Sequence, residues 1–195
     1  MLELAAKIFR APFVPVLAAS PGLGRYCVFG NLFARFGIGS DGPIHRLDRH
    51  PSASRHPVTP MKEADLRRHL ARQTRRRIAL FDILQLALPE REARTALNKI
   101  LEGKPDAVLF DALYPEQWVL IGKLIDAFAT AQRPLFSIGS SGIETALAAH
   151  WSAIQGSCAT RFRTTRTTTA SEWRPRTTSI SGHRTRAAFV RSRSG

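Results

Sequence analysis

Short apolar runs alternate with amphipathic stretches over roughly the first 155 residues of the chain. Stretches with apolar residues three and four positions apart indicate helices, and short, mostly apolar runs indicate buried strands. Gly103 follows one amphipathic stretch, at the kind of position where a helix commonly ends. The pattern predicts helices at 1–9, 60–74, 89–102, 115–131 and from 143 to about 151, and strands at 13–19, 77–82, 107–111 and 135–138.

Strands that alternate with helices in this way form a parallel sheet whose faces are covered by the helices. The chain is therefore predicted to be α/β, a Rossmann-like three-layer domain with a mainly parallel sheet that is incomplete within this sequence. Residues 26–33 are apolar enough to be a further strand or one arm of a hairpin.

The segment 46–61 interrupts this pattern with three prolines, two histidines and three arginines. Its prolines exclude a central strand or a helix interior, so we expect a long loop held in one shape. Long ordered loops in compact domains are usually functional. The next helix is expected to begin at its end, where Thr59 can cap and Pro60 fits the first helical position.

Polar residues follow the predicted strands, at the edge where ligands bind to open α/β sheets. Asp82 is interpreted mainly as a helix cap. For Asp111 a functional and a capping role stay equally open, because it has no obvious turn to cap. The four strand ends carry Ser20, Asp82, Asp111 and Ser140 with Ser141.

The turn formed by Gly139, Ser140, Ser141 and Gly142 lies between a strand and a helix. Small residues allow a ligand close to the backbone, and the N-terminus of a helix attracts carboxylate or phosphate groups. Ser141 with Glu144 also matches a capping box, and both roles are compatible. Arg25, on a glycine-rich loop after the first strand, is either a clamp for a carboxylate or a solvent-facing arginine.

Several motifs follow one another in a characteristic order. They are Gly-Arg-Tyr-Cys-Val-Phe-Gly-Asn-Leu-Phe at 24–33, Leu-Asp-Arg-His-Pro at 47–51, His-Pro-Val-Thr-Pro-Met at 56–61 with Glu63, Asp65 and Leu66, then Asp111, then the turn at 139–142. In this order the chain resembles the four-carbon acid sugar kinase family over roughly residues 1–155.

The resemblance implies a two-domain enzyme in which an N-terminal α/β domain binds a sugar acid such as threonate, erythronate or oxo-tetronate. A C-terminal domain would bind ATP with Mg²⁺, and phosphate would be transferred in the cleft between the two domains. The family's acidic Asp-Asp-Phe-Thr-Gly-Ala motif and its ATP domain have no counterpart in this sequence. Residues 1–155 are therefore expected to be part of the sugar-acid domain, unable to bind ATP well or to phosphorylate alone.

The resemblance also implies which residues meet the substrate. The carboxylate of the sugar acid is expected to contact Arg25 and the turn at 139–142, while the loop at 46–61 walls the site. No catalytic residue is assigned. The implied substrate-binding set is Arg25, His56, Thr59, Asp111, Gly139, Ser140, Ser141 and Gly142.

The C-terminal segment differs in composition from the rest. Residues 159–195 hold nine arginines, nine threonines and no lysine, and contribute more than half of the formal net charge of +14. With few apolar residues and no period, residues 156–195 are expected to be disordered. A frame-shifted reading of GC-rich DNA explains this composition, and a basic arm that binds nucleic acid, at least non-specifically, is the alternative.

Other classes of function receive little support. His45, His50 and His56 lie near Asp48, but their spacing matches no usual zinc pattern, so no metal is expected. Two cysteines are too few for a disulfide framework. The absence of a long apolar run and of a basic leader predicts a cytoplasmic protein without a membrane partner.

Overall fold

The computed structural model describes residues 2–9, 11–37, 41–130 and 132–163. Its centre is a parallel sheet with the strand order β5-β6-β1-β7. The expected α/β class with a parallel sheet is therefore confirmed. The strands of this sheet are β1 (Val14–Leu17), β5 (Ile78–Phe81), β6 (Ala107–Phe110) and β7 (Ile138–Gly139).

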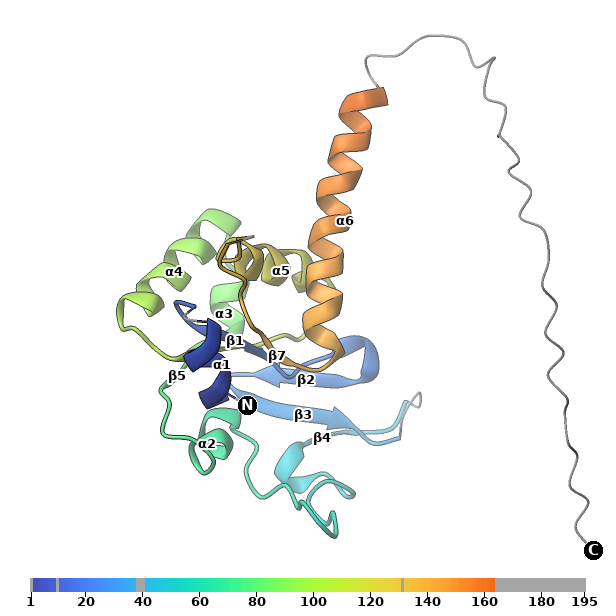
Figure 1. Ribbon diagram of the computed structural model, residues 1–195. Helices are drawn as coiled ribbons and strands as arrows, with labels where there is room; N and C mark the ends of the chain where they lie inside the picture. The colour runs from blue at the N-terminus through green and yellow to red at the C-terminus, as the bar shows by residue number, and fades with distance from the viewer. Residues whose placement is uncertain (1, 10, 38–40, 131, 164–195) are drawn as a thin grey trace, which may run out of the picture.

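Helices lie on both sides of the parallel sheet (Figure 1). In the view of Figure 1, α4 and α5 lie above the sheet and α2 lies below it, while α6 extends well beyond the rest of the domain. The helices are α1 (Leu2–Phe9), α2 (Leu66–Ala71), α3 (Ile83–Leu86), α4 (Glu90–Glu102), α5 (Trp118–Asp126) and α6 (Ser141–Arg163), with 3-10 turns η1 (Pro21–Leu23), η2 (Leu47–Arg49) and η3 (Pro115–Gln117).

The two central strands are apolar at every position because both faces of the sheet are covered. All residues of β1 and β6 are buried. Pro15 has no N–H to donate to a neighbouring strand. It fits within β1 because β7 pairs only with Val16 and Leu17 and does not extend to Pro15. Aromatic rings fill the adjoining core, with Phe81 and Phe110 at 5.4 Å between ring centres.

A second, antiparallel sheet is formed by β2 (Arg25–Val28), β3 (Asn31–Arg35) and β4 (Ile44–Arg46). The sequence pattern indicated its first hairpin but not β4. Cys27 and Leu32 pair across β2 and β3 and are buried, whereas Tyr26 and Phe33 pair on the half-buried face. The backbone of Cys27 also bonds that of Ala112, which joins the hairpin to the end of β6.

The expected helix at 60–74 is wrong in its start and in its length. The hydroxyl of Thr59 contacts His56 instead of capping a helix. Residues 61–65 are not helical, because Ala64 accepts a hydrogen bond from Leu32 and the chain lies against the β2–β3 hairpin. Helix α2 begins only after Asp65, whose carboxylate accepts from the N–H of Arg67 at 2.9 Å.

Other boundaries also differ from the sequence pattern. The expected helix at 115–131 is η3 followed by the shorter α5, and the strand at 135–138 is reduced to β7. The expected strands at 13–19, 77–82 and 107–111 and the helices at 1–9 and 89–102 are confirmed within a few residues. Helix α6 runs to Arg163, into the segment expected to be disordered, and residues 164–195 lie outside the described residues.

Glycines bring the backbone of α6 against its neighbours. A Cβ at Gly142 would overlap the carbonyl oxygen of Ala19, just after β1. A Cβ at Gly122, in the middle of α5, would overlap the carbonyl of Ala146 in α6. The start of α6 and its packing on α5 therefore both require that these positions have no side chain.

The variant Gly122→Ala should therefore lower the free energy of unfolding by about 1–3 kcal/mol, because rigid backbone must move to admit the methyl group. Gly22→Ala is the matched control, since nothing lies within 4 Å of its added Cβ, and its effect should stay within about 0.5 kcal/mol. Urea unfolding followed by circular dichroism measures both. Equal stability of the two variants would contradict the close contact of α5 and α6.

Candidate functional site

The carboxyl ends of β1 and β7 bring together two segments that are far apart in sequence. Ser20 follows β1, and the turn from Gly139 to Gly142 leads from β7 into α6. The hydroxyl oxygens of Ser20 and Ser141 lie 3.2 Å apart. We call Ser20, Ser140 and Ser141 the serine cluster.

The glycines of the turn serve protein packing first. A Cβ at Gly139 would overlap the carbonyl oxygen of Leu17, and Gly142 meets that of Ala19. This close approach places the N-terminus of α6 directly beside the end of β1. The glycines thus position the first amides of a long helix at the edge of the sheet, where a helix favours a negative charge.

Ser140 is the residue before α6, and its hydroxyl oxygen is buried without a hydrogen-bond partner, the one such side-chain atom among the described residues. Because α6 begins at Ser141, the cap position falls on Ser140, and the hydroxyl of Ser141 contacts Ser20. The carbonyl oxygen of Ser140 accepts from the N–H of Ile143 at 3.2 Å. The serine cluster therefore keeps unused hydrogen-bonding capacity at the helix start.

Arg25 is attached directly to this cluster. Its backbone exchanges two hydrogen bonds with Ser20, at 2.9 and 3.1 Å. Its side chain is exposed and forms no ion pair or hydrogen bond with any described residue. The backbone of Arg25 is thus held beside Ser20, whose hydroxyl contacts that of Ser141 at the start of α6.

Asp111 lies elsewhere, buried beneath the β2–β3 turn. Its carboxylate accepts backbone hydrogen bonds from Phe29 at 2.5 Å, Gly30 at 2.9 Å and Ile83 at 3.1 Å. The turn has positive φ at Phe29 and Gly30. Asp111 thereby ties the hairpin to the start of α3.

Burial raises the pKa of Asp111 above its ordinary value, against the opposing effect of the hydrogen bonds from Gly30, Cys27, Phe29 and Ile83. The neighbouring thiol of Cys27 also has a raised pKa, mainly because it is buried and next because Asp111 carries a negative charge. Both groups therefore belong to the packed interior between the two sheets.

The capping role expected for Asp82 is confirmed. Its carboxylate accepts from the N–H groups of Leu84 and Gln85, and the side chain of Gln85 accepts from the N–H of Asp82. This reciprocal pair is a capping box at the start of α3.

His56 and Thr59 belong to the loop between β4 and α2. In the view of Figure 1 this loop lies below β4, whereas α6 extends upward from the other side of the antiparallel sheet. His56 and Thr59 bond to each other, the ring nitrogen Nδ1 of His56 accepting from the N–H of Thr59 at 3.0 Å. Of the eight residues singled out in the sequence, Arg25 is linked to the turn at 139–142 through Ser20, by its backbone on one side and the hydroxyl of Ser141 on the other. The structure places Asp111, His56 and Thr59 apart from them.

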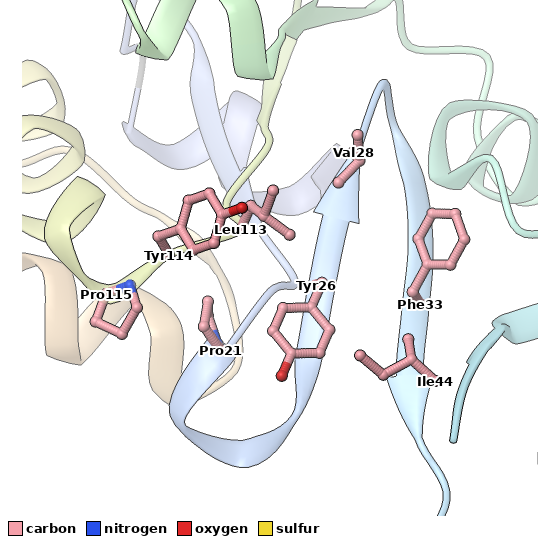
Figure 2. A pocket seen from close by; sticks show the side chains of 8 residues that line it. All are labelled: Pro21, Tyr26, Val28, Phe33, Ile44, Leu113, Tyr114 and Pro115. Atoms are coloured by element: carbon pink, nitrogen blue, oxygen red, sulfur yellow. The ribbon is translucent and has the colours of Figure 1, made fainter. Parts of the chain in front are cut away.

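An apolar cleft is a different feature, which the sequence did not reveal. It has a volume of about 530 Å³ and lies between the antiparallel sheet and the segment after β6 (Figure 2). Its walls are almost entirely apolar, so it offers a sugar acid hardly any hydrogen bonds. The lining residues are Pro21, Tyr26, Val28, Phe33, Ile44, Leu113, Tyr114 and Pro115.

Within the described residues, no three side chains of His, Cys, Asp or Glu gather closely enough to hold a metal ion. None of the helices in this part of the chain is long and apolar enough to cross a membrane.

Comparison with known proteins decides the family. The model of a sugar-binding N-terminal domain matches residues 1–147. The chain belongs to this family. Over 152 residues, the sugar-binding domain is 46% identical to the 3-oxo-isoapionate kinase of Paraburkholderia graminis, covering 78% of this chain and 31% of that enzyme. It is 31% identical over 133 residues to the 3-oxo-tetronate kinase of Methylobacterium radiotolerans, covering 68% of this chain and 28% of that enzyme.

These comparisons confirm the resemblance to the N-terminal domain of four-carbon acid sugar kinases. The chain spans less than a third of the length of these curated relatives. A crystal structure of a Haemophilus influenzae protein has the same fold, with a TM-score of 0.64 and 20% identity over 77% of this chain and 33% of its own. Neither the family model nor the two kinases point to nucleic-acid binding as a function of the sugar-binding domain.

Replacing Asp111 with Asn should destabilise the domain by about 2–3 kcal/mol, because an amide places N–H groups against backbone donors. The pH dependence has a definite sign. A raised pKa in the folded state means that protonation stabilises the fold, and this contribution is lost as the pH rises from 3.8 through the raised value. The stability advantage of the wild type over D111N should therefore shrink with rising pH in urea titrations. An advantage that grows with pH would contradict the raised pKa.

Proposed function

We propose that this chain is the sugar-acid-binding part of a kinase that phosphorylates four-carbon acid sugars. The observation that supports the proposal is the linkage of Arg25, through Ser20, to Ser141 at the start of α6, beside the ends of β1 and β7. The chain matches the model of a sugar-binding N-terminal domain, and we propose that Arg25 and the start of α6 together bind the carboxylate there.

A carboxylate fits this arrangement for two physical reasons. The first amides of α6 have no acceptor within the helix, and the helix dipole adds partial positive charge at the same place. Arg25 contributes a full charge whose planar fork matches a carboxylate. The hydroxyls of the serine cluster can then bond the hydroxyl groups of the same small molecule.

The remaining residues of the implied set have supporting roles in this proposal. Gly139 and Gly142 bring the helix to the edge of the sheet, and Asp111 fixes the hairpin that carries Arg25. His56 and Thr59 shape the loop at 46–61, which lies away from the start of α6, so we propose no contact of these two residues with the sugar acid. Arg25, Ser140 and Ser141 are the residues that we propose to contact the sugar acid.

Phosphoryl transfer also needs groups that hold the nucleotide phosphates and Mg²⁺ in line with the accepting hydroxyl. We propose that the part of the relatives not spanned by this chain supplies them, and that the chain alone transfers no phosphate. We further propose that the Arg- and Thr-rich segment 156–195, beyond the matched residues 1–147, is a frame-shifted reading rather than part of the site. A gene sequence without a kinase-like continuation in another frame would contradict this.

Arg25→Gln should weaken the binding of D-threonate and D-erythronate by about 10- to 100-fold, the usual worth of a charged hydrogen bond. Arg91→Gln is the matched control, because Arg91 is also exposed but lies on α4. Isothermal titration calorimetry measures both variants. Erythritol, which lacks the carboxylate, should not bind the wild type, and equal losses in R25Q and R91Q would contradict the proposed site.

The purified chain should show no ATP-dependent phosphorylation of D-threonate, D-erythronate or 3-oxo-tetronate above a no-enzyme blank. A coupled ADP-release assay with product detection by mass spectrometry measures this. Turnover that persists after repurification and is abolished by R25Q would overturn the proposed inactivity while supporting the binding site.

A further inference from the structure

The loop between β4 and α2 contains two His-Pro pairs that use the same local device. Nδ1 of His50 accepts hydrogen bonds from the backbone N–H groups of Ser52 at 3.3 Å and Ala53 at 3.2 Å. Nδ1 of His56 accepts from the N–H and contacts the hydroxyl of Thr59, both at 3.0 Å. Each imidazole thus caps the turn that follows its own proline.

These contacts determine which ring nitrogen carries the proton when each imidazole is neutral. A nitrogen that accepts a backbone N–H cannot carry a proton, so each neutral ring holds its proton on Nε2. An imidazolium has two N–H donors and no acceptor. Protonation of His50 or His56 would therefore put a proton on Nδ1, which would then face the backbone N–H groups that now donate to it. The hydrogen bonds of the cap would be lost.

Little else holds the tip of this loop. No helix or strand lies between His50 and Asp65 in the described structure. Apart from the two caps, the carbonyl of Ala53 accepts from the N–H groups of Met61 at 2.9 Å and His56 at 3.4 Å. The carbonyl of His50 accepts from the N–H and the hydroxyl of Ser54. The hydrogen bond between Met61 and Ala53 thus closes a loop that contains the His56 cap. The His50 cap ends at Ala53, where this closed loop begins.

The surroundings of the two rings do not stabilise a positive charge on either imidazole, which favours opening of the loop when a ring is protonated. His50 is buried and packs on the rings of Phe36 and His45, at 5.7 and 5.9 Å between centres. Asp48, the nearest acid on the same segment, is engaged by Arg46 at 2.6 Å.

The other charged residues of the segment are mostly basic. Arg49 and Arg55 are exposed, and the ammonium of Lys62 donates to the carbonyl of Ser54. The acid that follows, Glu63, faces Arg68 at 4.0 Å and accepts from the N–H of Asp65. A positive charge on His50 or His56 would therefore be repelled by these basic side chains. The acids of the segment, Asp48 and Glu63, already face arginines.

We propose that residues 50–61 form a pH-responsive loop, which neutral His50 and His56 hold in one shape and their protonation releases. The inference does not depend on the proposed sugar-acid site, because it rests on contacts within the loop.

The test is amide hydrogen exchange of the full chain by NMR, at pH 7.5 and pH 5.0, corrected for the intrinsic exchange rate. Protection of the amides of Ala53 and Thr59 should fall at least about fivefold at the lower pH, the usual effect of losing one hydrogen bond. The amide of Leu109, in the buried β6, should keep its protection. Unchanged protection in the loop, or a parallel loss at Leu109, would overturn the proposal.

Variants separate protonation from other effects of acid. In His50→Asn and His56→Asn the side-chain oxygen can accept in place of Nδ1 but does not titrate, so each variant should lose the pH dependence of its own cap. His69→Asn is the matched control, because the ring of His69 contacts Gln73 and caps no turn. A pH response that persists in the double variant H50N/H56N would contradict the proposal, as would Nδ1–H tautomers in long-range ¹H–¹⁵N spectra.

Discussion

The backbone of α6 contacts β1 and α5 at places where there is no room for a side chain. Gly139 and Gly142 meet the carbonyl groups of Leu17 and Ala19, and Gly122 meets that of Ala146. Interiors are packed too tightly to absorb an added methyl group at such positions without moving backbone. This close approach determines where α6 begins, and with it where a partial positive charge lies at the sheet edge.

The two sheets carry different residues of the candidate site. The parallel sheet supplies the strand ends that carry the serine cluster, while the antiparallel sheet carries Arg25. Asp111 joins the two by binding the β2–β3 turn and the start of α3 at once. The apolar cleft beside Tyr26 and Tyr114 is chemically unsuited to a sugar acid. The site that we propose therefore lies at the polar groups beside the start of α6 rather than in this cleft.

The sequence predicted the strands and the α/β class well because short, continuous apolar runs between helices are typical of strands that are buried on both faces. It also placed Asp82 correctly, since a strand-end aspartate before Gln85 is a local capping signal. The sequence wrongly predicted a helix start at Thr59 and Pro60, because two other interactions hold this part of the chain in a non-helical conformation. These are the His56 cap and the pairing of residues 64–66 with the hairpin.

The candidate site could be predicted only in part, because local motifs show in the sequence whereas contacts between distant segments do not. The turn at 139–142 is a local motif, so the sequence indicated it directly, and Arg25 likewise stood out on its glycine-rich loop. The buried role of Asp111 depends on a hairpin more than eighty residues away in sequence, which no local pattern shows. Likewise, the His50 cap depends on backbone amides that carry no sequence signal.

The most direct measurement of the central claim is a titration of the ¹⁵N-labelled chain with D-threonate, followed in two-dimensional ¹H–¹⁵N spectra. Saturable shifts at the amides of Ser20, Arg25 and residues 139–143, with little change near Tyr114, are the result that the proposed site predicts. Shifts confined to the apolar cleft, or no saturable shifts in a folded spectrum, would contradict it.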